Sequence, residues 1–137
     1  TRSDSVTGVQ TCALPICCGW FDAVATRHAC MVNGVDDLAI TNIDGLDTVE
    51  TIRVCVAYRA GGATYDHVPN DAQLLAKCQP VYADFPGWLT PTGKAATWKA
   101  LPPKTRQYLK ALAELSGAQL LIASVGPARD QTIVVRK

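Results

Sequence analysis

The stretch Ile52–Tyr58, IRVCVAY, decides the fold class of this chain. Its β-branched and aromatic side chains predict a buried strand. The residues Ala60–Gly62 then predict a turn, with Thr64–Val68 pairing back as a hairpin. Further short apolar runs predict strands at Leu38–Ile43, Val81–Phe85, Leu120–Ala123 and Thr132–Val135.

Three predicted helices separate these strands. The clearest covers Pro103–Ser116, because proline suits a first helical turn and Gly117 suits a helix end. Another runs from Trp20 to a stop at Asn33-Gly34, and a short one over Asp71–Lys77 is capped by Asn70. This alternation predicts an α/β fold with a mixed sheet flanked by helices. The expected buried faces comprise Tyr108, Leu109, Leu112 and Leu115 in the long helix, and Phe21, Val24, Ala25, His28 and Met31 or Val32 in the first.

Composition and charge narrow the possible classes of function. Apolar residues make up 48% of the 137 residues, which predicts a folded domain. The net charge of +1 gives no reason to expect nucleic acid or a membrane as a partner. The six cysteines form no CxxC pair, and Cys55 lies inside the apolar run. This usage favours reduced thiols and a cytoplasmic location over a disulfide-bearing secreted domain.

Two segments that follow predicted strands are the candidate binding residues, because ligands of open α/β sheets bind outside the carboxyl ends of strands. Asp44, at the end of Thr41–Asp44, could accept side by side from the ring N–H and the exocyclic amine of guanine, a pair that adenine lacks. In Ser124–Pro127, Gly126 permits close approach to a planar ligand and Ser124 offers a hydroxyl. Each pattern is also, and more commonly, that of an ordinary turn.

The residues themselves point to no catalytic centre. His28 and His67 are the only histidines. We expect His28 to be a packing or surface residue of its helix, and His67 to have no carboxylate or cysteine partner at ligand spacing. Neither a GxSxG motif nor a GxxxxGK phosphate loop occurs. We therefore assign no catalytic residue and no metal ligand.

Residues 1–17 are expected not to belong to the domain. The segment Val6–Ile16, VTGVQTCALPI, resembles the translation of a common short-read sequencing adaptor over its whole length without a gap. We expect residues 1–17 to be an artefactual or disordered scar. The natural domain then occupies residues 18–137 and is cut at its front.

Six segments in order carry a family resemblance. They are GWFDAV at Gly19–Val24, LAITNIDGLD at Leu38–Asp47, VCVAYR at Val54–Arg59, PVY followed by PGW within Pro80–Trp88, LPPKTRQYLKALAELSG at Leu101–Gly117 and SVGPAR at Ser124–Arg129. Together they resemble the C-terminal part of the adenylosuccinate synthetase family, with its GWxDxV, TKLDxLD, PGW and STGPxR segments. The resemblance implies the C-terminal part of a P-loop-NTPase-like α/β fold.

The resemblance also implies an activity and a site. The family ligates IMP and L-aspartate to adenylosuccinate in AMP biosynthesis, driven by GTP with Mg²⁺, and is usually homodimeric. Asp44 would accept from the guanine donors, in one segment with Asn42 and Ile43. Asn42 stands where the family usually has lysine, whose aliphatic stem covers the base. The base would be lined from the other side by Ser124, Val125, Gly126 and Pro127.

The family's TGRxR loop, phosphate-binding loop, catalytic aspartate and histidine, and Mg²⁺ ligands all precede the segments found here. The 137-residue chain alone is therefore expected to be inactive. The alternative is a standalone nucleotide-binding or interaction module without catalysis.

Overall fold

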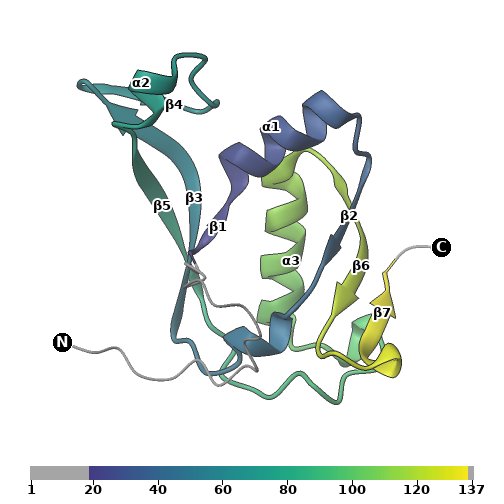
Figure 1. The fold of residues 1–137 in the computed structure, drawn as a ribbon. Helices are drawn as coiled ribbons and strands as arrows, with labels where there is room; N and C mark the ends of the chain where they lie inside the picture. Colours follow the sequence, from purple (N-terminus) through teal and green to yellow (C-terminus); the bar gives the residue numbers. More distant parts are fainter. Residues whose placement is uncertain (1–18, 136–137) are drawn as a thin grey trace, which may run out of the picture.

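The computed structural model describes residues 19–135, which form two mixed β-sheets with a long helix between them (Figure 1). The α/β class with mixed sheets and helices is confirmed, although the strands divide between two sheets. The segment 1–17, which we expect to be a scar, lies outside the described residues. None of the helices in the described part is long and apolar enough to cross a bilayer.

The first sheet is built on the strand that the apolar run predicts. This strand, β3 (Thr51–Ala60), pairs in parallel with β1 (Phe21–Asp22) and antiparallel with β4 (Ala63–Tyr65) and β5 (Gln79–Pro86). The β3–β4 pairing confirms the predicted hairpin. The buried side chains of β3 include Ile52, Val54 and Cys55, as its β-branched composition predicts.

The second sheet carries the end of the chain. Its strands are β2 (Asp37–Ile40), β6 (Gln119–Ser124) and β7 (Thr132–Val134). Strand β2 runs parallel to β6, and β7 runs antiparallel to β6. Because β2 and β6 are parallel neighbours, the segments that follow both strands begin at the same edge of this sheet.

Helix α3 (Pro103–Ser116) lies between the two sheets and organises the main core (Figure 1). Its bounds confirm the prediction, because Pro103 lies in the first turn and Gly117 ends the helix in the left-handed region at φ 68°. Leu109 and Leu112 are fully buried, and each contributes about 1.5–3 kcal/mol through burial. The core around them contains Ile43, Ile52, Val54, Trp88, Leu101, Tyr108, Leu120, Ala123, Val125 and Ile133.

Helix α1 (Ala23–Asn33) differs from its prediction in its start and in its buried face. Phe21 and Asp22 pair with β3 instead of starting the helix. The side facing α3 and β3 carries Ala23, Val24 and Cys30, which are buried. The face expected to be buried is therefore largely wrong, since Ala25, His28, Met31 and Val32 are all exposed.

The remaining elements are short. Helix α2 (Ala72–Leu75) is capped by Asp71, whose Oδ1 accepts from the Gln73 N–H at 2.8 Å, so the prediction of Asn70 as the cap is wrong. Three 3-10 turns, η1 (Ile43–Leu46), η2 (Trp98–Ala100) and η3 (Arg129–Gln131), complete the described part.

Candidate functional site

Both candidate segments lie at one edge of the second sheet. Ile40 at the end of β2 is paired with Ala123 near the end of β6, so Thr41–Asp44 and Ser124–Pro127 start from neighbouring parallel strands. This edge is the place where open α/β sheets bind ligands. The sequence indicates that each segment follows a strand, but no local pattern indicates that the two strands are neighbours.

The first segment turns sharply at Asn42. Asn42 adopts the left-handed conformation (φ 58°, ψ 35°), which ends β2 three residues earlier than predicted and starts η1. Asparagine tolerates this conformation better than most residues. Ile43 then points into the core, where it is fully buried, and Asp44 is exposed.

Asp44 presents an unengaged carboxylate. Its backbone carbonyl accepts from the Asp47 N–H at 3.1 Å, but its side chain accepts no hydrogen bond from any of residues 19–135. An exposed carboxylate with both oxygens available is suited to two adjacent N–H donors on one ligand.

The second segment is held from inside. Ser124 is 9% exposed, and its hydroxyl donates to the Gly126 carbonyl at 2.8 Å. Val125 is fully buried and donates its N–H to the Gln131 carbonyl at 3.0 Å. Ser124 and Val125 therefore shape the turn, while Gly126 and Pro127 form its accessible part.

Glycine at position 126 is explained by close packing. A Cβ on Gly126 would lie 2.2 Å from Oε1 of Gln131, so the glutamine side chain rests directly on the backbone there. From the sequence, Gly126 is expected to allow the close approach of a ligand. The structure shows that an internal side chain already uses this freedom on one side.

A cavity of about 250 Å³ opens beside the first segment. Thr41, Asn42 and Ile43 line it together with Trp20 and Tyr108. Burial raises the pKa of Tyr108 from its ordinary value of 10.0 to about 12, so its hydroxyl stays protonated even in mildly alkaline solution. The first segment therefore borders a space that has both aromatic and polar walls.

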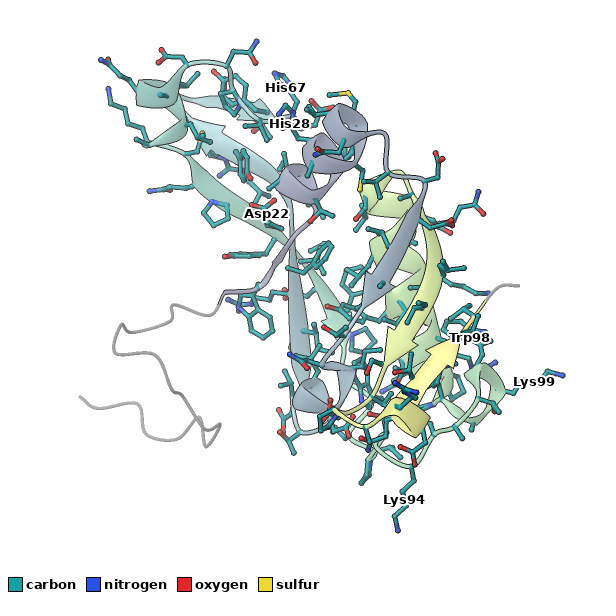
Figure 2. All side chains as sticks on the ribbon, turned by 45° about the vertical axis from the view of Figure 1, so that its right-hand side comes forward. Asp22, His28, His67, Lys94, Trp98 and Lys99 are labelled. Atoms are coloured by element: carbon teal, nitrogen blue, oxygen red, sulfur yellow. The ribbon has the colours of Figure 1, made fainter. Side chains whose placement is uncertain are left out.

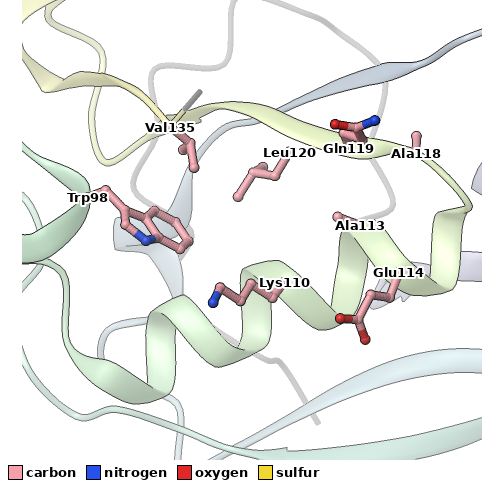
Figure 3. A pocket seen from close by; sticks show the side chains of 8 residues that line it. All are labelled: Trp98, Lys110, Ala113, Glu114, Ala118, Gln119, Leu120 and Val135. Atoms are coloured by element: carbon pink, nitrogen blue, oxygen red, sulfur yellow. The ribbon is translucent and has the colours of Figure 1, made fainter. Parts of the chain in front are cut away.

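A second groove, of about 390 Å³, lies elsewhere and includes none of the candidate residues. It runs between α3 and β6, where Trp98, Lys110 and Leu120 line it (Figure 3). Its walls are mostly apolar apart from Lys110, Glu114 and Gln119. We assign it no role in the candidate site.

The histidines lie far from the strand-end edge. Figure 2 shows His28 and His67 at the end of the molecule opposite to Lys94. Nδ1 of His67 lies 2.9 Å from Oδ1 of Asp66, so the prediction that His67 lacks a carboxylate partner is wrong. This hydrogen bond lowers the pKa of the exposed Asp66 carboxyl. Within residues 19–135, no group of three or more His, Cys, Asp or Glu side chains could hold a metal ion.

The cysteines of the described part are not bonded to one another. Cys30, Cys55 and Cys78 are free thiols, which agrees with the expectation of reduced cysteines for these three positions. Desolvation and the nearby Asp22 raise the pKa of the Cys55 thiol, so it behaves as a small core residue. Cys12, Cys17 and Cys18 lie outside the described residues.

Asp47 and Gln131, which no sequence pattern indicated, hold the two candidate segments in place. Asp47 accepts hydrogen bonds from the Trp88 indole at 2.6 Å and from the Thr92 backbone and hydroxyl at 2.7 and 2.9 Å. Gln131 donates to the Gly93 carbonyl at 2.9 Å and accepts from the Ala128 N–H at 3.0 Å. Asp47 lies within the quoted LAITNIDGLD segment, but no local pattern indicates its distant partners.

The candidate binding residues of this α/β domain lie at the carboxyl ends of neighbouring parallel strands. This arrangement is typical of α/β proteins that bind ligands. The chain belongs to the adenylosuccinate synthetase family, whose model matches residues 7–133. This match begins inside the segment 1–17, so the expected domain boundary at residue 18 stays a prediction.

Individual relatives agree with this assignment. The chain is 49% identical over 125 residues to the adenylosuccinate synthetase of Gloeobacter violaceus, covering 91% of this chain and 28% of the relative. It is 50% identical over 118 residues to that of Synechocystis sp., covering 86% and 27%. The chain therefore spans little more than a quarter of the length of these relatives.

A solved structure supports the same fold. The fully ligated adenylosuccinate synthetase from Plasmodium falciparum superposes with a TM-score of 0.80 at 25% sequence identity. The similarity covers 87% of this chain and 29% of that one.

Proposed function

We propose that this chain is the C-terminal, guanine-binding part of an adenylosuccinate synthetase, which uses GTP to ligate IMP and L-aspartate. Asp44 accepts from the ring N–H and exocyclic amine of guanine. Asn42 and Ile43 shape its turn, and Ser124, Val125, Gly126 and Pro127 form the opposite wall. In the parent enzyme, which we take to be a cytoplasmic homodimer on the resemblance alone, this part recognises the base of GTP.

One observation carries the proposal: the unengaged carboxylate of Asp44 lies at the same sheet edge as the Gly126 turn. A carboxylate accepts from the two guanine donors but finds no such pair on adenine. The exposed Pro127 and the accessible Gly126 backbone offer a flat surface for a planar base. Family membership adds that the relatives of this chain are adenylosuccinate synthetases.

The chain by itself does not carry out the ligation under this proposal. Phosphoryl transfer needs a phosphate cradle and a general base, and the sequence contains no GxxxxGK loop. The described residues offer no cluster of three or more side chains for a metal ion. The family resemblance alone implies that the Mg²⁺ ligands precede the segments found here. Purified chain supplied with GTP, IMP, aspartate and Mg²⁺ should release no phosphate above the rate of a no-protein control. IMP-dependent release would contradict this part of the proposal.

Guanine recognition is tested by nuclear magnetic resonance of the ¹⁵N-labelled chain titrated with GMP, and with AMP as the matched competitor. We expect GMP to move the amide signals of Asn42–Gly45 and Ser124–Ala128, and AMP to leave them in place. Asp44→Asn should abolish the GMP response, because its amide places a donor opposite the guanine donors. Asp36→Asn is the control, since Asp36 is exposed and its side chain makes no described hydrogen bond.

Two outcomes would overturn the proposal. Equal responses to GMP and AMP would show that the base is not read at this edge. A GMP response that survives Asp44→Asn unchanged would move the site away from this carboxylate.

A further inference from the structure

One short loop contacts both halves of the candidate guanine site. The loop follows β5, and its consecutive residues Thr92 and Gly93 form hydrogen bonds with two different parts of the chain. Thr92 bonds to Asp47, which follows η1 and the Asp44 segment. Gly93 bonds to Gln131, which follows the Ser124–Pro127 turn. These bonds join residues that are 45 and 38 positions apart in the chain.

The Asp47 end of this connection is dense. Its Oδ2 accepts from the Thr92 N–H, and its Oδ1 accepts from both the Thr92 hydroxyl and the Trp88 indole. Thr92 is 1% exposed and Trp88 is buried, so these hydrogen bonds are shielded from water. Asp47 also donates its own N–H to the Asp44 carbonyl at 3.1 Å. The position of Asp44 is therefore tied to that of Thr92.

The Gln131 end is equally specific. The Gln131 carbonyl accepts from Val125, and its side-chain Oε1 accepts from Ala128. The same side chain lies against Gly126 and reaches Gly93 through Nε2. Every residue of the turn from Val125 to Ala128 except Pro127 thus contacts Gln131 or bonds to it.

We propose that Thr92 and Gly93 form a bridge that fixes the spacing between the two walls of the guanine site, with Asp47 and Gln131 as its positioning residues. This inference rests on the proposed function. Neither Asp47 nor Gln131 touches the base; each acts through the segment that it holds. A fixed spacing matters because a planar base is recognised only when both walls are held at the correct separation.

The bridge predicts communication between segments that share no direct hydrogen bond among the described residues. Thr92→Val keeps the shape of the side chain but removes the hydroxyl bond to Asp47. Gln131→Met keeps the length of the side chain but removes both of its hydrogen bonds. The matched control is Gln107→Met, because Gln107 is exposed on α3 and its side chain makes no described hydrogen bond.

The first measurement needs no nucleotide. In the free ¹⁵N-labelled chain, Gln131→Met should shift the amide signals of Asp44 and Asp47, and Thr92→Val should shift those of Val125 and Gly126. Gln107→Met should move neither set. The spectrum of each variant also shows whether the chain remains folded. Shifts confined to the mutated side would overturn the bridge.

The second measurement is GMP affinity in a double-mutant cycle. Each single variant should weaken GMP binding about fivefold to tenfold, the effect of about one net hydrogen bond. The double variant should bind GMP only slightly less tightly than the single variant with the lower affinity. Breaking either end of the bridge already frees the two walls from their fixed separation. If the loss of GMP affinity in the double variant equals the product of the two single losses, the bridge is overturned, because two independent structural defects would give that result.

The two proposals fail in different ways. Suppose that the unsubstituted chain shows no GMP-selective response, but that Gln131→Met and Thr92→Val still shift the distant amide signals in the nucleotide-free chain. The proposed guanine-binding function then fails, and the bridge remains as a structural feature. If GMP binds through Asp44, but Thr92→Val and Gln131→Met bind GMP as tightly as the unsubstituted chain, only the bridge proposal fails.

Discussion

Gly87 lies directly against the backbone of Val49, so closely that a Cβ at position 87 would fall 1.7 Å from the Val49 carbonyl oxygen. The Gly87 N–H donates to the Glu50 carbonyl at 2.8 Å, and its own carbonyl accepts from the Lys104 ammonium at 3.1 Å. This contact holds the end of β5 against the chain that enters β3. It also places the next residue, Trp88, where its indole reaches Asp47.

Gly87→Ala is therefore expected to destabilise the chain by at least about 2 kcal/mol, because the obstructing atom is backbone and cannot rotate away. Urea unfolding followed by circular dichroism measures the loss. Gly45→Ala is the control, since no atom lies within 4 Å of a Cβ at that position and its φ is not positive. Equal midpoints for the two variants would contradict the close contact.

Asn42→Lys tests why this chain departs from the family pattern. The lysine stem would cover the face of the base, so we expect GMP to bind several-fold more tightly, by about 1 kcal/mol. The left-handed conformation at position 42 should cost folding stability by about 1 kcal/mol, because lysine tolerates it less well than asparagine. Calorimetric GMP titration and thermal unfolding measure the two effects separately. Tighter binding without any loss of stability would show that position 42 is not strained.

The exposed apolar face of α1 should promote self-association. Met31 is 73% and Val32 is 65% exposed, and Val35 lies close by in the sequence. Contiguous exposed apolar patches of this kind favour association. The double variant Met31→Gln, Val32→Lys should lower the fraction of oligomer that sedimentation velocity measures. It should not lower the melting temperature, since both new residues suit a helix. Leu75→Gln, at an exposed leucine of α2, is the control and should leave association unchanged.

Tyr108 should make the folded state sensitive to alkali. Burial raises its pKa from 10.0 to about 12, so the folded state favours the neutral phenol. The corresponding stability is fully present below pH 10 and is lost as the pH rises towards 12, by about 3 kcal/mol in total.

Tyr108→Phe should flatten this decline between pH 10 and 12 and change stability little at pH 7, because burial alone raises the pKa of Tyr108, with no contribution from a hydrogen bond within the described residues. Urea unfolding at a series of pH values checks it, with Tyr82→Phe at an exposed position as the control. An unchanged pH profile in Tyr108→Phe would show that this phenol does not control the decline.

Local chemistry explains which parts of the fold could be predicted. Helix α3 has a proline at its start and a glycine that takes the left-handed conformation after its end, so its bounds follow from the sequence. Helix α1 also ends at such a glycine, but its buried face depends on the neighbours it meets. The repeat of apolar residues pointed to Val24 and to Met31 or Val32. Packing against α3 and β3 buries Val24 as predicted, but it also buries Ala23 and Cys30 and leaves Met31 and Val32 exposed.

The candidate site was likewise predictable only in its local features. The positions of Asp44 and Gly126 after strands could be predicted because each follows a recognisable strand; their role in binding stays a prediction. The division of the strands into two sheets could not, because pairing joins segments far apart in the sequence. The partners of Asp47 and Gln131 were missed for the same reason, since their hydrogen bonds cross 38 to 45 residues.

Asp22 shows how tightly the start of α1 is coupled to the first sheet. One carboxylate oxygen accepts from the Ala25 N–H at 2.9 Å, and the other accepts from the Tyr58 hydroxyl at 2.5 Å. Fraying of the first helical turn that displaces Asp22 therefore also breaks its hydrogen bond with the Tyr58 hydroxyl of β3. We therefore expect the amides of Ala25 and of central β3 to show similar protection in hydrogen exchange, as parts of one cooperative opening unit.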